Sequence, residues 1–463
     1  MNILNNDTIC APATAAGGAL AIIRVSGPNA LPIVSTLCSL CCDAVAANTT
    51  HFTRLVEYDA VSQHPLPIDE ALITTFRAPH SYTGEDSVEI SCHGSRYIIN
   101  KILELLIQRG CRMARPGEFT QRAYLNGKLD LSQAEAVADL IASTNKATHE
   151  LAMSQLRGGI SSELGRLRER LLKLTSLLEL ELDFSDHEDL EFADRTTLTS
   201  IAEEIQSRVT RLAHSFETGK ALKEGIPVAI VGKTNVGKST LLNRLLKDDR
   251  AIVSDVHGTT RDTIEDTIDL HGVTFRFIDT AGIRQTTDEV EQIGIQRTYA
   301  AIEKARIVLW IFDTPPSEAE IADITERTQG RSLIMVQNKI DKNNAFCPDN
   351  QNTPALQCPL IRISAKHGQG LEELEAAIYE AAHLPTLSDT DIIISNARHY
   401  EALIKSAESL HRVIAGLQAN LSGDLIAEDL RIVLSDLTEI TGQSQITPNE
   451  VLSNIFKHFC IGK

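Results

Sequence analysis

The stretch Gly232-Lys233-Thr234-Asn235-Val236-Gly237-Lys238-Ser239 determines the fold that we expect for the centre of this chain. It follows an apolar run, 226–231, that predicts a buried strand, and a helical pattern begins directly after it at Thr240. A glycine-rich loop between a strand and a helix lets backbone N–H groups approach phosphates at the positive end of the helix dipole. Lys238 would then reach the terminal phosphates, and the Ser239 hydroxyl would bind Mg²⁺. For this motif alone, an ordinary glycine-rich turn is the alternative.

Three later motifs also follow predicted strands, and each suits a different part of a guanine nucleotide. Asp279-Thr280-Ala281-Gly282 follows the run 273–278 and suits a water-mediated Mg²⁺ contact, with a glycine amide facing the γ-phosphate. Asn338-Lys339-Ile340-Asp341 follows the run 332–336, and its aspartate can accept two N–H bonds that guanine supplies and adenine does not. Ser364-Ala365-Lys366 follows the run 360–363 and suits a backbone donor to the guanine carbonyl. Four motifs in this order predict a Ras-like P-loop GTPase domain.

The group that orients the attacking water is not evident from these motifs. Signalling GTPases place a glutamine after D-x-x-G, whereas this chain has Ile283, whose apolar side chain cannot align water. Arg261 and Arg284 flank the site without an evident finger role. Thr259 or Thr260 is expected to close over Mg²⁺, and the spacing does not choose between them.

Composition narrows the classes of function. With 463 residues, 43% hydrophobic and 23% charged, the chain is expected to be a soluble protein of about three domains. Its net charge of −18 argues against non-specific nucleic-acid binding, although a local patch or a partner could still bring a nucleic acid. No run of about 18 apolar residues predicts a membrane span. The cysteine cluster Cys38, Cys41 and Cys42 lacks a second cluster for a metal site, so we expect reduced thiols and a cytoplasmic protein.

Hydrophobic periodicity divides the chain into α/β and all-α parts. Residues 1–122 predict an α/β domain, with strands over 21–25, 52–58, 70–76 and 88–92 and a helix over 96–108. Residues 123–222 predict helices, the first opened by a capping box at Ser132-Gln133-Ala134-Glu135 and running to Gly158. The GTPase domain is expected over 223–384, and further helices over 385–463.

Leucine-rich stripes lie on both sides of the predicted GTPase domain. They consist of Leu164, Leu167, Leu171, Leu174 and Leu178 before it, and of Leu403, Ala407, Leu410, Ile414, Leu417 and Leu421 after it. Such stripes must be buried, and we expect them to bury each other in one helical bundle into which the GTPase domain is inserted.

Several motifs together resemble the tRNA modification GTPase family MnmE, also called TrmE. They are Tyr82-Thr83-Gly84-Glu85-Asp86, the Arg-Pro-Gly-Glu-Phe-Thr run 115–120, Asn126-Gly127-Lys128-Leu129-Asp130-Leu131, the Gly-Thr-Thr-Arg-Asp run 258–262 and the terminal Phe459-Cys460-Ile461-Gly462-Lys463. Composition alone would assign the first two stretches to turns and solvated charges. The resemblance runs from one end of the chain to the other.

The resemblance implies an N-terminal folate-binding domain that dimerises, a helical domain and an inserted GTPase domain. It implies that the protein acts with the flavoprotein MnmG on carbon 5 of the wobble uridine of certain tRNAs, adding aminomethyl or carboxymethylaminomethyl groups. A tetrahydrofolate derivative, 5,10-methylene- or 5-formyl-tetrahydrofolate, would supply the one-carbon unit. The positions that match the family's folate contacts are Arg24, Glu89, Lys128 and Lys463. For Arg24 and Glu89, a strand-end salt bridge is the alternative.

The resemblance also implies that potassium takes the place of an arginine finger when two GTPase domains meet. Its protein ligands would be Asn235, Ser254, Val256 and Thr259, while Thr260 joins Ser239 on Mg²⁺ and Glu291 orients the water. A solvated helix charge is the alternative for Glu291, which lies beside Asp288 and Glu289. Motifs and resemblance together give the candidate GTP-binding residues Asn235, Val236, Gly237, Lys238, Ser239, Thr240, Ser254, Thr259, Thr260, Asp279, Thr280, Ala281, Gly282, Asn338, Lys339, Asp341, Ser364, Ala365 and Lys366.

Two other classes of protein share parts of this pattern. A ribosome-assembly or other RNA-associated GTPase predicts a basic RNA-binding appendage, which this acidic chain lacks. A dynamin-like scaffold that acts on membranes predicts a basic amphipathic or apolar surface, and none is evident. The tRNA-modifying GTPase is therefore the expected function.

Overall fold

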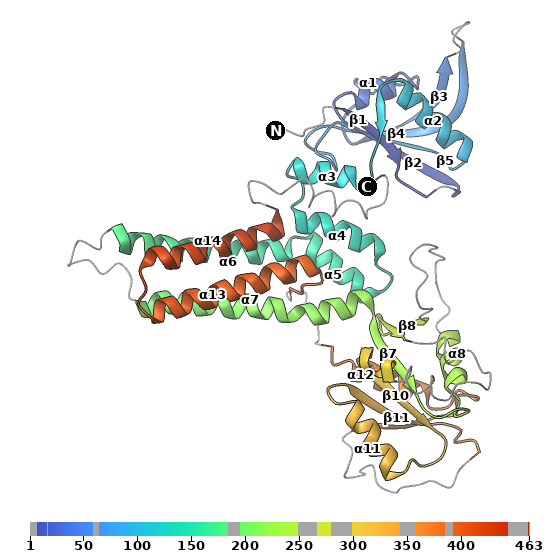
Figure 1. Cartoon of the computed structure of the whole chain (residues 1–463). Helices are drawn as coiled ribbons and strands as arrows, with labels where there is room; N and C mark the ends of the chain where they lie inside the picture. The colour runs from blue at the N-terminus through green and yellow to red at the C-terminus, as the bar shows by residue number, and fades with distance from the viewer. Residues whose placement is uncertain are drawn as a thin grey trace. The chain divides into compact units, whose positions relative to one another are not determined.

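The computed structural model describes residues 7–15, 17–58, 64–183, 195–248, 266–278, 299–342, 358–384, 392–442 and 462. The chain divides into two compact units, of which the first comprises 1–141, 155–206 and 405–463 and the second 142–154 and 207–404. The division falls within two long helices, α7 (Arg195–Glu224) and α13 (Ala397–Gln418). Figure 1 shows the elements of each unit.

The first unit contains a six-stranded sheet that is covered by helices on one face. Its strands are β1 (Thr8–Pro12), β2 (Leu20–Ser26), β3 (Thr49–Tyr58), β4 (Pro65–Phe76), β5 (Ser87–His93) and β6 (Cys111–Met113), in the order β3-β4-β5-β2-β1-β6. The helices α1 (Ala30–Ser35) and α2 (Arg96–Gln108) pack on the face that carries Ile23, Ile73 and Ile90. The alternation of buried and exposed residues along β2, β4 and β5 follows from this one-sided burial.

The opposite face of this sheet carries both apolar and charged side chains. The strand register aligns Phe52, Leu72 and Ser91 in one row across β3, β4 and β5. The same register aligns Arg24 on β2 with Glu89 on β5. Phe52 is 65% exposed and Leu72 is 46% exposed. The second row places two of the predicted folate positions next to each other, with side chains that are 18% and 27% exposed.

The helical segment after residue 122 differs from the sequence prediction in two respects. One helix was expected from Ser132 to Gly158, but the structure has α4 (Leu131–Ala142) and α5 (Lys146–Leu156). The capping box at the start of α4 also begins two residues earlier than predicted. Asp130 Oδ1 accepts the Gln133 backbone N–H at 2.9 Å, and Gln133 Oε1 accepts the Asp130 N–H at 3.0 Å. Asp130 therefore ends the preceding loop and caps the helix, a role that was assigned to Ser132.

The leucine stripe of the first unit lies in a helical bundle, as predicted. Every member from Leu164 to Leu178 in α6 (Gly159–Asp183) is at most 4% exposed. α6 packs against α14 (Gly423–Thr441), a helix that the stripe did not single out. Figure 1 shows α6 and α14 side by side with α7 and α13. Leu421, the last member of the predicted C-terminal stripe, is 46% exposed because α13 ends at Gln418.

The second unit contains a mostly parallel sheet buried on both faces. Its strands are β7 (Ile226–Val231), β8 (Asp266–Leu270), β9 (Val273–Phe277), β10 (Ile307–Phe312), β11 (Ser332–Gln337) and β12 (Leu360–Arg362), in the order β12-β11-β10-β7-β9-β8. Only β8 pairs antiparallel. The described helices of this α/β part are α8 (Lys238–Asp248), α11 (Glu318–Arg327) and α12 (Leu371–Ala381). Separate core clusters cover the two faces of the sheet, which explains the continuous apolar runs in the sequence.

Parallel strands bring their carboxyl ends to one edge of the sheet, where α/β proteins bind ligands. The loops after β7, β10, β11 and β12 therefore meet, and three of them carry predicted nucleotide motifs. None of the helices in the described ranges is long and apolar enough to cross a bilayer.

Candidate functional sites

The phosphate loop, 232–237, connects β7 to α8. The amino group of Lys238 lies over this loop, where it donates to the carbonyl oxygens of Gly232 at 2.5 Å and Lys233 at 2.8 Å. Burial lowers the pKa of Lys238 below its ordinary value. Asn235 and Gly237 both have a positive φ, 62° and 104°. The loop therefore wraps closely around the ammonium group of Lys238. In a complex with nucleotide, phosphate oxygens can replace the backbone carbonyls as the partners of this group.

Asn338 joins the phosphate loop to the two motifs that were predicted to bind guanine. Its side chain follows β11 and is buried, and its Nδ2 donates to the carbonyl oxygen of Val236 at 2.8 Å. Its Oδ1 accepts the backbone N–H groups of Lys339 at 2.8 Å and Ala365 at 3.0 Å. One amide side chain thus fixes three loops against each other.

Lys339 and Asp341 make further contacts between the same loops. Lys339 Nζ donates to the carbonyl oxygen of Asn235 at 2.6 Å and pairs with Asp313 at 2.8 Å. The Ser364 hydroxyl donates to Asp341 Oδ1 at 2.7 Å, and this bond lowers the pKa of the Asp341 carboxyl. The carboxylate is therefore ionised at neutral pH, as an acceptor of two guanine N–H groups must be.

Asp313 was not predicted as a member of this site. It follows β10, whose sequence Ile307–Phe312 is an apolar run of the same kind as those before the recognised motifs. An apolar run followed directly by an acidic residue is the sequence signal that could have identified Asp313.

Several predicted nucleotide and metal positions lie outside the residues that the structure describes. They are Ser254, Val256, Thr259, Thr260, Asp279, Thr280, Ala281, Gly282 and Glu291. Of the described positions, Ser239 lies in the first turn of α8 beside Lys238, Thr240 follows it, and Lys366 is exposed after Ala365. Within the described ranges, no three His, Cys, Asp or Glu side chains group as metal ligands.

A second site lies on the open face of the sheet in the first unit. Arg24 donates to Glu89 Oε1 from Nε at 3.0 Å and from Nη2 at 2.8 Å. Its Nη1 donates to the carbonyl oxygen of Gly462 at 3.3 Å, although the two residues are 438 positions apart in the sequence. The guanidinium carbon lies 5.2 Å from the ring centre of Tyr82 and 5.6 Å from that of Phe119. The end of the chain thus meets a charged pair that is flanked by aromatic rings.

The two polar stretches that composition assigned to turns meet at this site. The hydroxyls of Tyr82, in the stretch 81–86, and Thr120, in the stretch 115–122, are 2.8 Å apart. Lys128 donates from Nζ to the carbonyl oxygen of Pro79 at 3.0 Å, and Asn126 Nδ2 donates to the Thr83 carbonyl at 2.7 Å. Lys128 is therefore held against the loop that carries Tyr82. Lys463 and Cys460 lie outside the described residues.

Comparison with known proteins gives matches over the whole chain. The family described as "MnmE helical domain" matches residues 131–460, and the one described as "GTP-binding protein TrmE N-terminus" matches residues 8–128. The chain is 51% identical to the tRNA modification GTPase MnmE of Phocaeicola vulgatus, with 100% of both chains covered. It is 52% identical to the protein of that name from Bacteroides thetaiotaomicron, over 99% of this chain and 100% of the relative. It is 48% identical to the protein of that name from Porphyromonas gingivalis, over 100% of this chain and 99% of the relative.

Proposed function

This chain belongs to the MnmE family of tRNA modification GTPases, and we propose that it acts with the flavoprotein MnmG on carbon 5 of the wobble uridine of certain tRNAs. The products would be aminomethyl or carboxymethylaminomethyl uridines. The observation that carries this proposal is the ion pair of Arg24 with Glu89, in which Arg24 also donates to the carbonyl oxygen of Gly462 near the end of the chain. A GTPase that only regulates assembly has no use for such a site, whereas an enzyme that transfers a one-carbon group must bind its carrier.

We propose that the carrier is a reduced folate, 5-formyl- or 5,10-methylene-tetrahydrofolate, held by Arg24, Glu89, Lys128 and Lys463. A carboxylate such as Glu89 accepts N–H groups of the kind that a pterin presents, and cationic side chains suit an anionic glutamate tail. The rings of Tyr82 and Phe119 beside Arg24 offer flat apolar surface to a heteroaromatic ring. When bound, the folate would supply the one-carbon unit of the reaction.

GTP would bind at the edge of the sheet in the second unit. The phosphate loop and Lys238 would take the phosphates, Asp341 the guanine edge, and Ser364 to Lys366 the guanine carbonyl. Ser239 in the first turn of α8 fits a Mg²⁺ ligand because its hydroxyl is a hard oxygen donor beside the phosphate-binding loop, and Thr260 would be the second. Mg²⁺ would neutralise charge on the phosphates. The bond from Ser364 holds Asp341 Oδ1 and lowers the pKa of the carboxyl further below neutral pH.

A homodimer through the first domain is also proposed. The uncovered sheet face exposes Leu20, Phe52 and Leu72, at 66%, 65% and 46%. Apolar side chains on an uncovered sheet face mark a protein–protein interface, and a second copy would cover them. Dimerisation would bring two GTPase domains together around potassium ions held by Asn235, Ser254, Val256 and Thr259.

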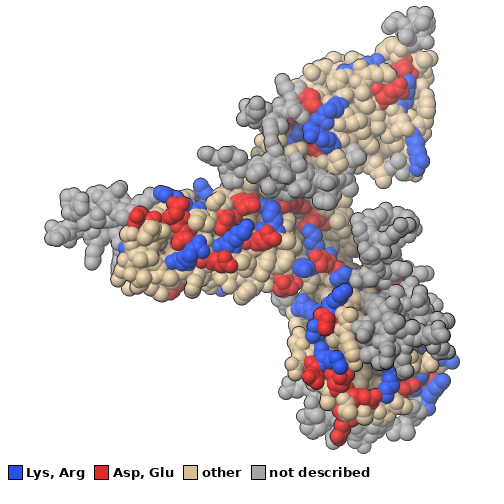
Figure 2. All heavy atoms as spheres, in the orientation of Figure 1, with Lys and Arg blue, Asp and Glu red and all other residues tan. Residues whose placement is uncertain are grey.

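The charge of the chain favours a shared binding surface for tRNA. Figure 2 shows basic and acidic side chains interspersed over the helices of the bundle, which does not resemble a continuous phosphate-binding surface. Because this chain has a net charge of −18, we propose that MnmG supplies much of the positive surface that binds the tRNA. The reaction would take place in the cytoplasm.

The test of this function is mass spectrometry of nucleosides from total tRNA of a strain that lacks the gene. We expect the carbon-5-modified wobble uridines to disappear, to return with the intact gene, and to remain absent with a Lys238→Ala variant. Lys304→Ala, which removes an exposed lysine outside the nucleotide motifs, is the matched control and should restore them. Persistence of the modified nucleosides in the deletion strain would contradict the proposed substrate and leave a GTPase with another target.

Replacement of Glu291 separates nucleotide binding from hydrolysis. Glu291→Ala is expected to leave GTP affinity unchanged and to lower kcat by about a hundredfold, the smaller end of a general acid–base contribution. Asp288→Ala, which removes a neighbouring acid, should retain turnover. Phosphate release at saturating GTP and potassium measures both variants. Normal turnover in Glu291→Ala would remove this residue from the mechanism, and a loss in Asp288→Ala alone would transfer the role to it.

Sodium is not expected to replace potassium in stimulating hydrolysis. The four proposed ligands would suit one size of ion between the phosphates, and we expect the rate in sodium to be lower than that in potassium by at least about tenfold. Rates are compared at equal ionic strength, because exposed charges respond to salt in general. Equal rates with the two ions would rule out the proposed role of Asn235.

A further inference from the structure

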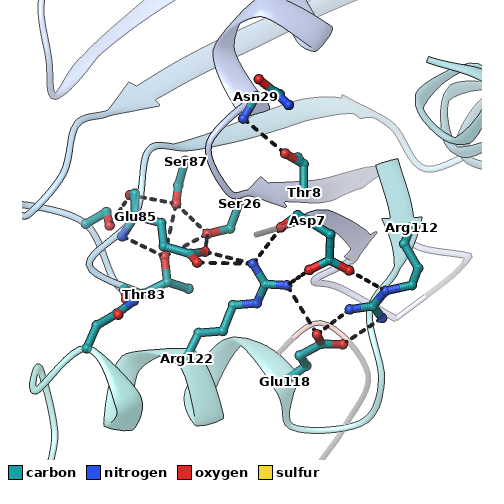
Figure 3. A network of polar contacts seen from close by, with 12 residues as sticks. Asp7, Thr8, Ser26, Asn29, Thr83, Glu85, Ser87, Arg112, Glu118 and Arg122 are labelled. Carbon is teal, nitrogen blue, oxygen red and sulfur yellow. Dashed lines mark hydrogen bonds and ion pairs between the residues drawn. The ribbon is translucent and has the colours of Figure 1, made fainter. Parts of the chain in front are cut away.

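Arg122 lies at the centre of a buried polar network in the first domain (Figure 3). It projects from α3 (Glu118–Leu125), and its side chain is 7% exposed. Its Nη1 donates to the carbonyl oxygen of Asp7 at 2.9 Å and to Glu85 at 3.1 and 3.2 Å. Its Nη2 donates to Asp7 Oδ1 at 2.7 Å and to Glu118 at 3.3 Å. One guanidinium thus joins the segment before β1, the loop before β5 and helix α3.

Glu118 is held from a second direction. Arg112, on β6, donates to its two carboxylate oxygens at 2.6 and 3.0 Å, and the Arg115 backbone N–H donates at 2.8 Å. Burial by itself would raise the pKa of Glu118, but these bonds outweigh it and the pKa is lowered. The carboxylate therefore stays charged, and the start of α3 is anchored to β6.

Glu85 connects the same network to β2. Ser26 donates to its Oε2 at 2.8 Å, and the hydroxyls of Ser26 and Thr83 are 2.7 Å apart. Ser26 is two residues from Arg24 on one strand, and Thr83 is the neighbour of Tyr82. The position of Glu85 thus fixes both the strand and the loop that meet at the folate site.

Two of the three segments that Arg122 joins carry the rings that flank Arg24. Tyr82 belongs to the loop held through Glu85, and Phe119 follows Glu118 directly in α3. The Tyr82 and Thr120 hydroxyls, 2.8 Å apart, are a second link between these segments. A change at Arg122 would let the loop and the helix separate, and Arg24 would lose the surfaces on both sides of it.

We propose that Arg122 is a positioning residue for the folate site, which makes this inference dependent on the function proposed above. It does not touch the ligand. It acts through Glu85 and Glu118, which set the distance between the two aromatic rings around Arg24. A lysine at this position would keep the charge, but its single ammonium cannot reproduce the planar fork that spans three partners.

The experiment is calorimetric titration of the full chain with 5-formyltetrahydrofolate. Arg122→Lys is expected to weaken binding by at least about tenfold, which corresponds to 1.4 kcal/mol. Glu85→Gln is the second variant, in case Arg122→Lys does not fold. It keeps the volume of the side chain, removes its charge and should also weaken binding. The matched control is Ile102→Val, at a core position on α2 that is 1% exposed. It removes one buried methylene from the same domain, and its Kd should equal that of the unaltered chain.

A double substitution distinguishes positioning from a general loss of stability. If Arg122 acts through Arg24, adding Arg122→Lys to Arg24→Lys should weaken binding by much less than its effect alone, because coupled residues are not additive. Multiplying effects, or an unchanged Kd in both Arg122→Lys and Glu85→Gln, would overturn the positioning role while the folate site stands. No binding by the unaltered chain would overturn the folate site itself, and the role of Arg122 with it.

Discussion

Asp341→Asn is expected to lower the affinity for GTP by about ten-thousandfold and to raise that for xanthosine triphosphate. A site built to pair with substrate N–H groups rejects a ligand that leaves its buried polar groups unpaired by roughly this factor. An ionised carboxylate accepts both guanine N–H groups, whereas asparagine offers one acceptor and one N–H donor. Xanthine carries a carbonyl oxygen where guanine carries its amino group, so the new donor meets an acceptor. The Ser364 hydroxyl, now 2.7 Å from Asp341 Oδ1, can still donate to the amide oxygen.

Displacement of a fluorescent GTP analogue measures both affinities of the Asp341→Asn variant. Asp323→Asn is the matched control, because Asp323 pairs with Arg327 on the surface of α11 and takes no part in the nucleotide motifs. It should bind GTP like the unaltered chain. Retention of GTP preference in Asp341→Asn would show that another group reads the guanine edge.

The parts of the fold that the sequence predicted are those whose burial leaves a regular pattern. β7 and β11 appear as apolar runs because both faces of their sheet are covered, whereas β9 alternates between buried and half-buried residues and β12 is mostly exposed. The helix predicted over 96–108 coincides with α2, whose stripe faces a single core. The strands β1, between β2 and β6, and β6, at the edge of the first sheet, left no such pattern because they are only five and three residues long. They were not predicted.

Helix ends were harder to predict, because several residues of the same type compete to cap a helix. Both Asp130 and Ser132 are good N-caps by type, and a suitable partner lies three residues after each. The structure decides between them by the reciprocal bonds of Asp130 and Gln133. The separation of α4 from α5 follows from Asn145, whose Oδ1 accepts the Thr148 N–H at 2.8 Å and starts a new helix.

The motifs of the candidate nucleotide site could be recognised in the sequence, because each motif is contiguous and follows its own strand. The contacts between motifs could not. That Asn338 binds the phosphate loop at Val236 depends on the order of β7, β10 and β11 in the sheet. The proposed folate site depends still more on tertiary structure, since Arg24 meets Gly462 across almost the whole chain. Family resemblance assigned Arg24 and Glu89, but nothing local indicated the part played by Arg122.

Gly237→Ala is expected to lower GTP affinity by roughly a thousandfold, although it adds only one methyl group. Gly237 has a φ of +104°, which L side chains rarely adopt, and a Cβ there would lie 2.2 Å from Nδ2 of Asn338. Asn338 cannot yield without giving up its bonds to Val236 and Ala365. Backbone strain and overpacking of about 1–3 kcal/mol each would therefore act on the loop that holds the phosphates. Equilibrium titration with a fluorescent GTP analogue measures the loss.

Gly330→Ala separates the effect of crowding from that of backbone strain. Gly330 also has a positive φ, +76°, but a Cβ there would meet nothing within 4 Å. We expect a loss of stability of about 1 kcal/mol from strain alone, with GTP affinity unchanged. If Gly237→Ala also binds GTP normally, the phosphate loop can move away from Asn338 without cost, and the contact between these loops does not shape the site. If only Gly237→Ala loses affinity, the contact with Asn338 sets the conformation in which the loop receives phosphate.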